Sequence, residues 1–108
     1  MRMWNVDSKL LCRKHILGEH VECHMFIGTI QKGKSLHGYI SKGLVEVHNL
    51  RNRHDALVME MTRRGYNHKS PLPEAELWIE GNVNVEENLV ELRRRCVHCK
   101  ELQEALNV

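Results

Sequence analysis

Apolar residues near the end of this chain recur at steps of three and four, and this spacing constrains the fold more than any other feature. The row runs through Val85, Leu89, Leu92, Cys96, Cys99, Leu102 and Leu106. Such steps place side chains on one face of an α-helix. Asn84 is a candidate N-cap, and Glu86 and Glu87 follow in the first turn, where the helix dipole favours acids. The row predicts one long amphipathic helix.

Two earlier segments show similar spacing. After Gly43 the row is Leu44, Val47, Leu50, His54, Leu57, Val58 and Met61. Gly65 then stands where a glycine commonly ends a helix. Near the start, Asp7 or Ser8 is a candidate cap for a short first turn, and the row is Leu10, Leu17, Val21, Met25 and Gly28. Gly18 interrupts this helix, which we interpret as the close approach of another backbone.

The segments between these rows read as connections. Residues 32–38 form a loop, and residues 66–84, with two prolines, form a long irregular connection that Leu77, Trp78 and Ile79 pin to the core. A short helix over 74–79 is an alternative. No strand pattern competes, and 108 residues suit one modest core. We therefore predict an all-α protein, a single domain over 1–108 with three main helices around one core.

Composition narrows the classes of function. The net charge is only +2 and aromatic residues make up 5% of the chain, which argues against a protein that stacks many bases on its rings. No apolar run approaches the roughly 18 residues that span a bilayer, and the start is polar, so no membrane association is expected. We expect a cytoplasmic protein, in a bacterium or a phage-infected cell, with reduced cysteines.

The first 28 residues carry the most complete chemistry. Arg2 follows the amino terminus, and Glu19 and Glu22 lie among histidines on a segment that favours a helix. If that helix packs on the terminus, one site holds an amine, a guanidinium and a carboxylate, the parts of an imine-forming DNA lyase. An α-amino group has an unperturbed pKa of about 7.7–8.0, against about 10.4 for lysine, so the terminus supplies more uncharged nucleophile near neutral pH.

Several motifs together resemble a known family. They are Arg2 and Asn5, the run from His15 through Gly18-Glu19 to Glu22, Gly33-Lys34, and the segments 50–54 and 63–67, with weaker similarity from Leu89 to Arg95. In these the chain resembles the phage pyrimidine-dimer DNA glycosylases, the endonuclease V group of base-excision repair enzymes. The resemblance is clearest over 1–67 and weak after 73.

The resemblance implies a DNA glycosylase and AP lyase that acts on double-stranded DNA at pyrimidine dimers or abasic sites and needs no cofactor. Its nucleophile position falls on Met1 itself, which we expect to be retained because Arg2 is bulky. Glu22 takes the place of the family's catalytic acid, and Arg2 binds phosphate or orients Glu22. His15 and Glu19 are the expected orienting groups. Val21 and Met25 stand where the family has basic residues beside the catalytic glutamate.

Basic residues elsewhere are candidates for phosphate contacts. They are Lys32, Lys34, Arg51, Arg53, Arg63, Arg64, Lys69, Arg93, Arg94 and Arg95. We favour Lys34, Arg51, Arg64 and Arg95 as the DNA-binding set.

Two other functions remain open. One is a non-catalytic nucleic-acid-binding protein on the same fold. The other is a small zinc-binding interaction module that uses His20, His24 and the pair Cys96 and Cys99. His20 and His24 share a helix face, whereas a single CxxC pair on an apolar row favours cysteines packed in the core.

Overall fold

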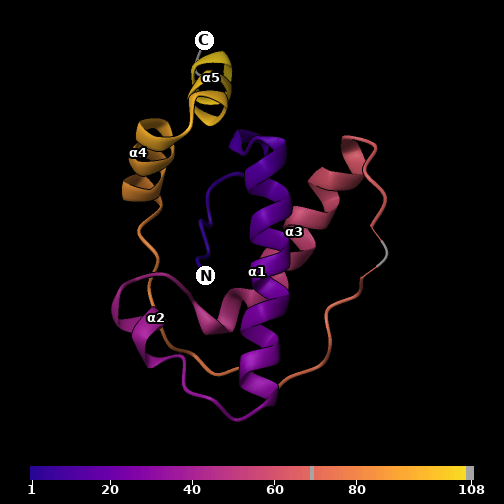
Figure 1. Ribbon diagram of the computed structural model, residues 1–108, viewed down its shortest axis with the longest axis vertical. Helices are drawn as coiled ribbons and strands as arrows, with labels where there is room; N and C mark the ends of the chain where they lie inside the picture. Colours follow the sequence, from indigo (N-terminus) through magenta and orange to yellow (C-terminus); the bar gives the residue numbers. More distant parts are fainter. Residues whose placement is uncertain (69, 107–108) are drawn as a thin grey trace.

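Helices make up the regular structure of the described residues, 1–68 and 70–106, in the computed structural model (Figure 1). In chain order they are the 3-10 helix η1 (Ser8–Leu10), α1 (Arg13–Gln31), α2 (His37–Ser41), the 3-10 helix η2 (Val47–Asn49), α3 (Leu50–Arg63), α4 (Val85–Arg95) and α5 (Val97–Leu106). The predicted all-α class is confirmed, because no strand occurs in these residues. No helix among them is long and apolar enough to cross a membrane.

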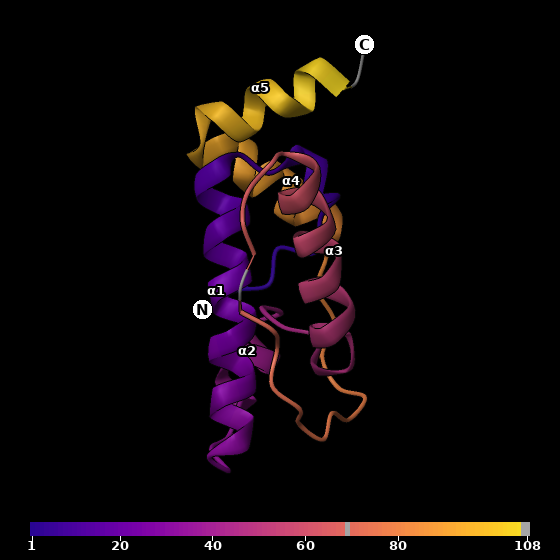
Figure 2. The same cartoon turned by 90° about the vertical axis from the view of Figure 1, so that its right-hand side faces the viewer.

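The long helix α1 packs against α3, and the two form the centre of the molecule (Figures 1 and 2). The face of α1 that is buried differs from the predicted one. Its buried residues are Ile16, Glu19, His20, Cys23, Phe26 and Ile27. Val21 and Met25, which we expected in the core, are 54% and 49% exposed. The prediction from the apolar row was wrong because Glu19 and His20 are buried on this face. Both have polar partners outside α1, Arg53 for Glu19 and His68 for His20.

The first six residues lie beside the first half of α1, and the chain begins near the middle of that helix (Figure 1). Met3, Trp4 and Val6 are buried, and the Met3 N–H donates to the Leu44 carbonyl at 2.7 Å. Below them, a cluster around Phe26 fills the space between α1 and the residues before α3. The start of the chain is therefore part of the core, and this fixes the position of the amino terminus.

The predicted last helix is two helices, because the chain leaves helical geometry at Cys96. The Cys96 backbone is extended, with φ −136° and ψ 111°, and α5 then leaves in a new direction (Figure 2). The expected start is confirmed, since the Asn84 side chain accepts a hydrogen bond from the Glu87 N–H at 3.0 Å. The apolar row did not reveal the break, since Cys99 and Leu102 keep facing the core after it.

The connection over 66–84 contains no helix in its described part, so the alternative of a helix at 74–79 is wrong. Leu72 and Val83 are buried and Leu77 packs against the same cluster, whereas the other two predicted anchors, Trp78 and Ile79, are exposed. Close backbone packing holds its far end. Gly81 has φ +96°, and a Cβ there would lie 2.2 Å from the Val45 carbonyl oxygen.

The other predicted boundaries are close to those observed. Gly65 has φ +83° and follows α3 as a helix stop. The second main helix starts at Leu50, after a separate 3-10 turn, and not directly after Gly43. The predicted loop after α1 is shorter than expected, because α2 already begins at His37.

Candidate active site

A buried ion pair fixes the geometry around the amino terminus. The Arg53 guanidinium on α3 donates to both Glu19 carboxylate oxygens on α1, at 2.5 and 2.9 Å, and to the Val6 carbonyl at 2.6 Å. Glu19 also accepts the Asn5 N–H at 3.4 Å. Asn5 has φ +55°, a left-handed conformation that asparagine tolerates better than most residues. Glu19 therefore holds the terminal segment against α1.

Glu22 lies one turn further along α1, partly buried beside the start of the chain. Burial raises the pKa of its carboxyl group. The positive terminal amine and a hydrogen bond from the Arg2 backbone act in the opposite direction and favour the carboxylate. The terminal amine thus acts on Glu22 as a nearby positive charge, but the two groups, both among the described residues, form no ion pair.

The Arg2 side chain is held by α4. Its guanidinium donates to the Asn88 Oδ1 at 2.7 Å, and the Asn88 amide in turn donates to the Trp4 carbonyl at 2.7 Å. The Arg2 Cζ lies 3.9 Å from the centroid of the Trp4 ring, in cation–π contact, and the Arg95 Cζ lies 5.2 Å from the same ring. The two arginines are therefore gathered around one indole.

These groups surround a pocket of about 230 Å³. Its lining consists of Arg2, Trp4, Lys14, His15, Gly18, Glu19, Glu22 and Arg95. The side chains of three cationic residues, Arg2, Lys14 and Arg95, thus lie around the partly buried carboxylate of Glu22. Gly18 does not mark a close backbone contact as expected, because a Cβ there would meet nothing within 4 Å. Gly18 instead lines the pocket, and the space next to its Cα is open.

A family model described as pyrimidine dimer DNA glycosylase matches residues 1–74 of the 108. The chain belongs to the pyrimidine dimer DNA glycosylase family. Comparisons with curated proteins and with solved structures gave no match. The family match includes the terminal segment, α1 and α3, whereas Asn88 and Arg95 follow after its end.

The residues predicted to bind DNA lie apart from one another in this glycosylase-family chain. Arg95 lines the pocket and also pairs with Glu91 at 2.8 Å. Lys34 is exposed in the turn beyond the far end of α1. Arg51 donates to the Pro73 carbonyl at 2.9 Å.

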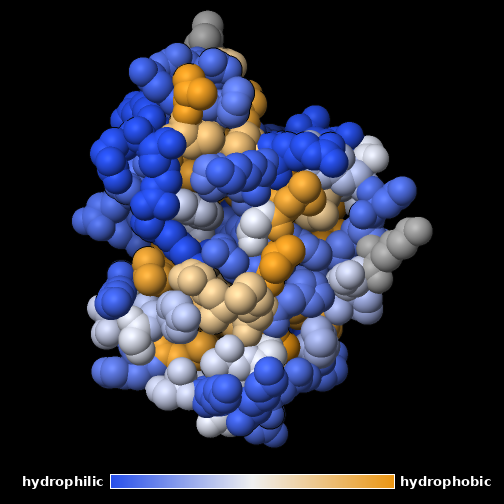
Figure 3. Space-filling view, in the orientation of Figure 1, coloured by the Kyte–Doolittle hydropathy of each residue, from blue (hydrophilic) through white to orange (hydrophobic). Residues whose placement is uncertain are grey.

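Arg64 serves an internal role. Its guanidinium donates to Glu60 at 2.7 Å and to the Leu11 carbonyl at 2.7 Å, and its side chain is only 16% exposed. These bonds join the end of α3 to the start of α1, so Arg64 is unsuited to bind a phosphate. Lys69 lies outside the described residues. Strongly hydrophilic side chains cover α4 and the upper end of α3, where the arginine segments 93–95 and 63–64 lie (Figure 3).

Sequence reasoning missed three residues of the site, Trp4, Lys14 and Asn88. Lys14 precedes Gly18 and Glu22 at four-residue steps, so all three lie on one face of α1, and this spacing was a usable signal. Asn88 left no such signal, because its role depends on how α4 packs against the terminal segment. Trp4 and Lys14 line the pocket, and Asn88 accepts a hydrogen bond from the Arg2 side chain.

The residues weighed as one metal site fall into two separate clusters. His20 and His24 meet His54 and His68, whereas Cys96 and Cys99 meet Cys12 and His15. Within each cluster the ligand atoms lie within 4.8 Å of one another. Burial, together with the neighbouring histidines, lowers the pKa of His20 to about 4, so this imidazole is neutral near neutral pH.

Proposed function

We propose that this protein is a DNA glycosylase and AP lyase of base-excision repair, which cleaves double-stranded DNA at pyrimidine dimers or abasic sites. The observation that carries the proposal is the gathering of Glu22, Arg2, Lys14 and Arg95 in one pocket beside the amino-terminal segment. Family membership supports action on DNA. The amine supplies the nucleophile, so the reaction needs no cofactor.

The chemistry proceeds in two steps. The uncharged Met1 amine attacks C1′ of the damaged nucleotide, forming a C–N bond as the bond to the base breaks and the sugar ring opens to an imine. The imine acidifies the C2′ proton, and its removal expels the 3′ phosphate by β-elimination. We expect Glu22 to stabilise the positive sugar and to move these protons, because its carboxylate lines the pocket beside the amino-terminal segment.

The cations of the pocket have a separate role. Arg2, Lys14 and Arg95 lie where a phosphate next to the reacting sugar would be neutralised. Each phosphate contact adds about one unit to the salt dependence of binding. Arg2 also borders the proposed reacting centre, since it lines the pocket together with Glu22 while its guanidinium is held by Asn88.

Borohydride trapping tests the proposal. The protein is mixed with a duplex that contains one abasic site, the imine is reduced to a covalent adduct, and peptide mapping locates it. We expect an adduct on the Met1 amine and its loss after chemical acetylation of the terminus. Glu22→Gln should lower strand cleavage by about 10²–10⁴-fold.

Glu104→Gln is the matched control, because Glu104 is an exposed glutamate on α5, outside the residues that line the pocket. Circular dichroism checks that each variant is folded. Salt-sensitive DNA binding with no adduct and no cleavage would overturn the proposal in favour of a non-catalytic binder. An adduct on a lysine would keep the lyase reaction and reject Met1 as its nucleophile.

A further inference from the structure

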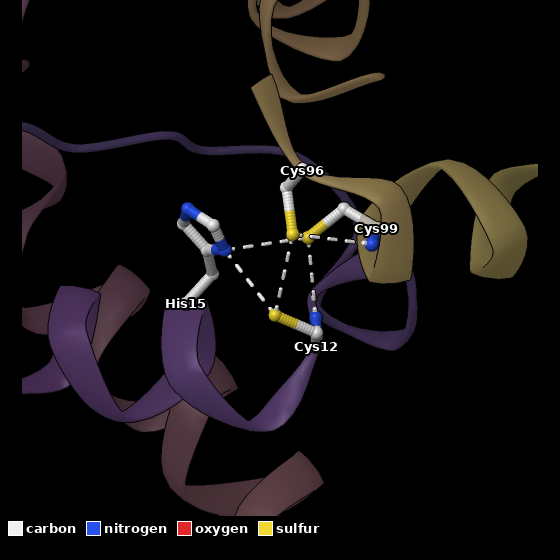
Figure 4. A group of neighbouring side chains, drawn as sticks. All are labelled: Cys12, His15, Cys96 and Cys99. Atoms are coloured by element: carbon white, nitrogen blue, oxygen red, sulfur yellow. Dashed lines mark hydrogen bonds between the residues drawn. The ribbon is translucent and has the colours of Figure 1, made fainter. Parts of the chain in front are cut away.

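We propose that Cys12, His15, Cys96 and Cys99 form a structural zinc site that fastens the junction of α4 and α5 to the start of α1 (Figure 4). This inference does not rest on the proposed lyase activity. It concerns a cluster that reaches the pocket only through His15 and contains none of the proposed nucleophile, acid or phosphate-binding groups.

The four ligand atoms lie within 4.8 Å of one another. A zinc ion with Zn–S bonds near 2.3 Å and Zn–N bonds near 2.05 Å requires S···S edges of about 3.8 Å and S···N edges of about 3.5 Å. The Cys12 and Cys96 sulfurs are 3.8 Å apart, and the Cys99 sulfur is 3.5 Å from the His15 Nδ1. The Cys12 sulfur lies 3.2 Å from the same nitrogen. The cluster therefore has the size of a zinc coordination shell.

The ligands come as two pairs with the same spacing, Cys12-x-x-His15 and Cys96-x-x-Cys99. Such pairs at short spacing, two per ion, are typical of structural zinc sites, and three thiolates with one imidazole are a donor set that zinc prefers. The sequence showed one pair plainly. The second pair was hidden because it contains a histidine and lies 80 or more residues away in the chain.

The backbone around the cluster is arranged to hold charged sulfurs. The Cys12 N–H points at the Cys99 sulfur at 3.4 Å, and the Cys99 N–H points at the Cys96 sulfur at 3.5 Å. Amide donors of this kind stabilise thiolates that ligate a metal. The break between α4 and α5 falls on Cys96. The Cys96 side chain points towards Cys12 at the start of α1 (Figure 4).

The cysteines belong to the apolar cluster that the sequence favoured for them, yet apolar packing alone does not require the contacts between their polar groups. The Cys12 and Cys99 sulfurs both contact the His15 Nδ1, and the Cys96 sulfur contacts the Cys12 sulfur. A disulfide would use two of the thiols and leave the third and His15 without a role. Lys14 and Arg95 lie beside His15 in the pocket wall, where their charges offset the single negative charge of a Zn(Cys)₃(His) centre.

The position of the site explains what it stabilises. His15 and Arg95 line the pocket, and Arg95 is the residue before Cys96. A zinc ion that joins Cys12 to Cys96 therefore holds α4 against the terminal segment. Without this link, α4 is kept there by packing of a few apolar residues such as Leu92 and by the hydrogen bonds of Asn88.

Cobalt substitution tests the assignment, because Co²⁺ bound by thiolates shows sulfur-to-metal charge transfer in the near ultraviolet and intense tetrahedral d–d bands. The full chain, purified without a histidine tag, is stripped with a chelator and titrated with Co²⁺ and then Zn²⁺. We expect thiolate bands that saturate at one equivalent, are displaced by Zn²⁺ and are lost in Cys96→Ser. Cys23→Ser is the matched control, a buried cysteine on α1 outside the cluster, and should keep the bands.

A second measurement on the unmodified protein covers the case in which Cys96→Ser fails to fold. X-ray absorption of the zinc-loaded chain should give three sulfur ligands and one nitrogen ligand. If Co²⁺ binds without thiolate bands and His24→Asn abolishes this binding, the metal lies in the histidine cluster. That result would overturn the proposal. A chain that binds no metal, or whose mass shows a disulfide that forms in place of metal binding, would overturn it as well. Imine trapping is read separately, so failure of one proposal leaves the other intact.

Discussion

The carboxylate of Glu19 and the guanidinium of Arg53 form a two-point ion pair in the interior, 34 residues apart in sequence, with side chains 0% and 6% exposed. The pair joins α1 to α3, and the same guanidinium holds the Val6 carbonyl. Two charged residues thus occupy positions that apolar residues fill in most helix–helix contacts. The terminal segment, and with it the pocket, is built on this pair.

Loss of Arg53 should be severely destabilising. In Arg53→Ala the Glu19 carboxylate stays buried without its cation, and breaking a buried pair in this way costs about 3–5 kcal/mol. Urea denaturation followed by circular dichroism measures the change. Arg51→Ala is the matched control on the same helix, because its contact with Glu74 is exposed and worth less than about 1 kcal/mol. Equal costs for the two variants would show that the pair contributes no special stability.

The Glu60 carboxylate should make the free energy of unfolding depend on pH in the acid range. Its hydrogen bonds from Arg63, and then from Arg64, lower its folded-state pKa from 4.5 to about 2. A group with a lowered folded pKa contributes stability above its unfolded pKa and loses it as the pH falls, here between about 4.5 and 2. Denaturation at a series of pH values should show a difference of about 1–3 kcal/mol between the native chain and Glu60→Gln that shrinks across this window. Glu104→Gln should follow the native chain, and a Glu60→Gln difference that does not change with pH would contradict the assignment.

Asn88 should behave as a positioning residue for Arg2. In Asn88→Ala the Arg2 guanidinium loses its acceptor and the Trp4 carbonyl loses its donor, so the pocket loosens without losing a reacting group. We expect single-turnover cleavage to slow by about 10- to 100-fold, with imine trapping still on Met1. Asn88→Asp, which keeps an acceptor for Arg2, should recover part of the rate.

Gln103→Ala is the control for Asn88→Ala, because Gln103 is a buried amide on α5 that bonds the Leu89 carbonyl and has no contact with Arg2. A similar loss of cleavage in this variant would mean that general loosening of α4, and not the position of Arg2, sets the rate.

Gly81 should tolerate no side chain. A Cβ there would lie 2.2 Å from the Val45 carbonyl oxygen, and its φ of +96° is strained for any other residue. Gly81→Ala should lower the free energy of unfolding by more than about 2 kcal/mol, through strain and displaced backbone. Gly38→Ala, with open space around the added carbon, should cause little change in the same urea experiment. A mild Gly81→Ala would show that the 66–84 connection shifts freely.

The helices and their ends could be predicted because local rules determine them. Asn84 caps α4, Gly65 ends α3, and the apolar row of α3 is largely buried. The buried face of α1 could not be predicted from hydropathy, since Glu19 and His20 lie on it while Val21 and Met25 face solvent. Their burial depends on partners in α3 and beyond, which a pattern within one helix does not contain.

The part of the candidate site near the start of the chain could be predicted, whereas the part on α4 could not. Arg2 and Glu22 line one pocket because α1 packs on the terminal segment, which the short distance along the chain made foreseeable. The contributions of Asn88 and Arg95 depend on the packing of α4, 60 or more residues later. Arg64 was misread because an arginine in a charged run gave no sign of its bonds to Glu60 and the Leu11 carbonyl.

The closure of the pocket by α4 has a consequence for protein synthesis. A nascent chain that has left the ribosome as far as residue 74 carries the terminal amine, Arg2 and Glu22, but lacks Asn88 and Arg95. The two walls of the pocket are joined only when a loop of more than 80 residues closes, which is entropically costly and comes late. A shorter nascent chain therefore lacks one wall of the pocket, and the proposed activity should arise only after α4 has been translated.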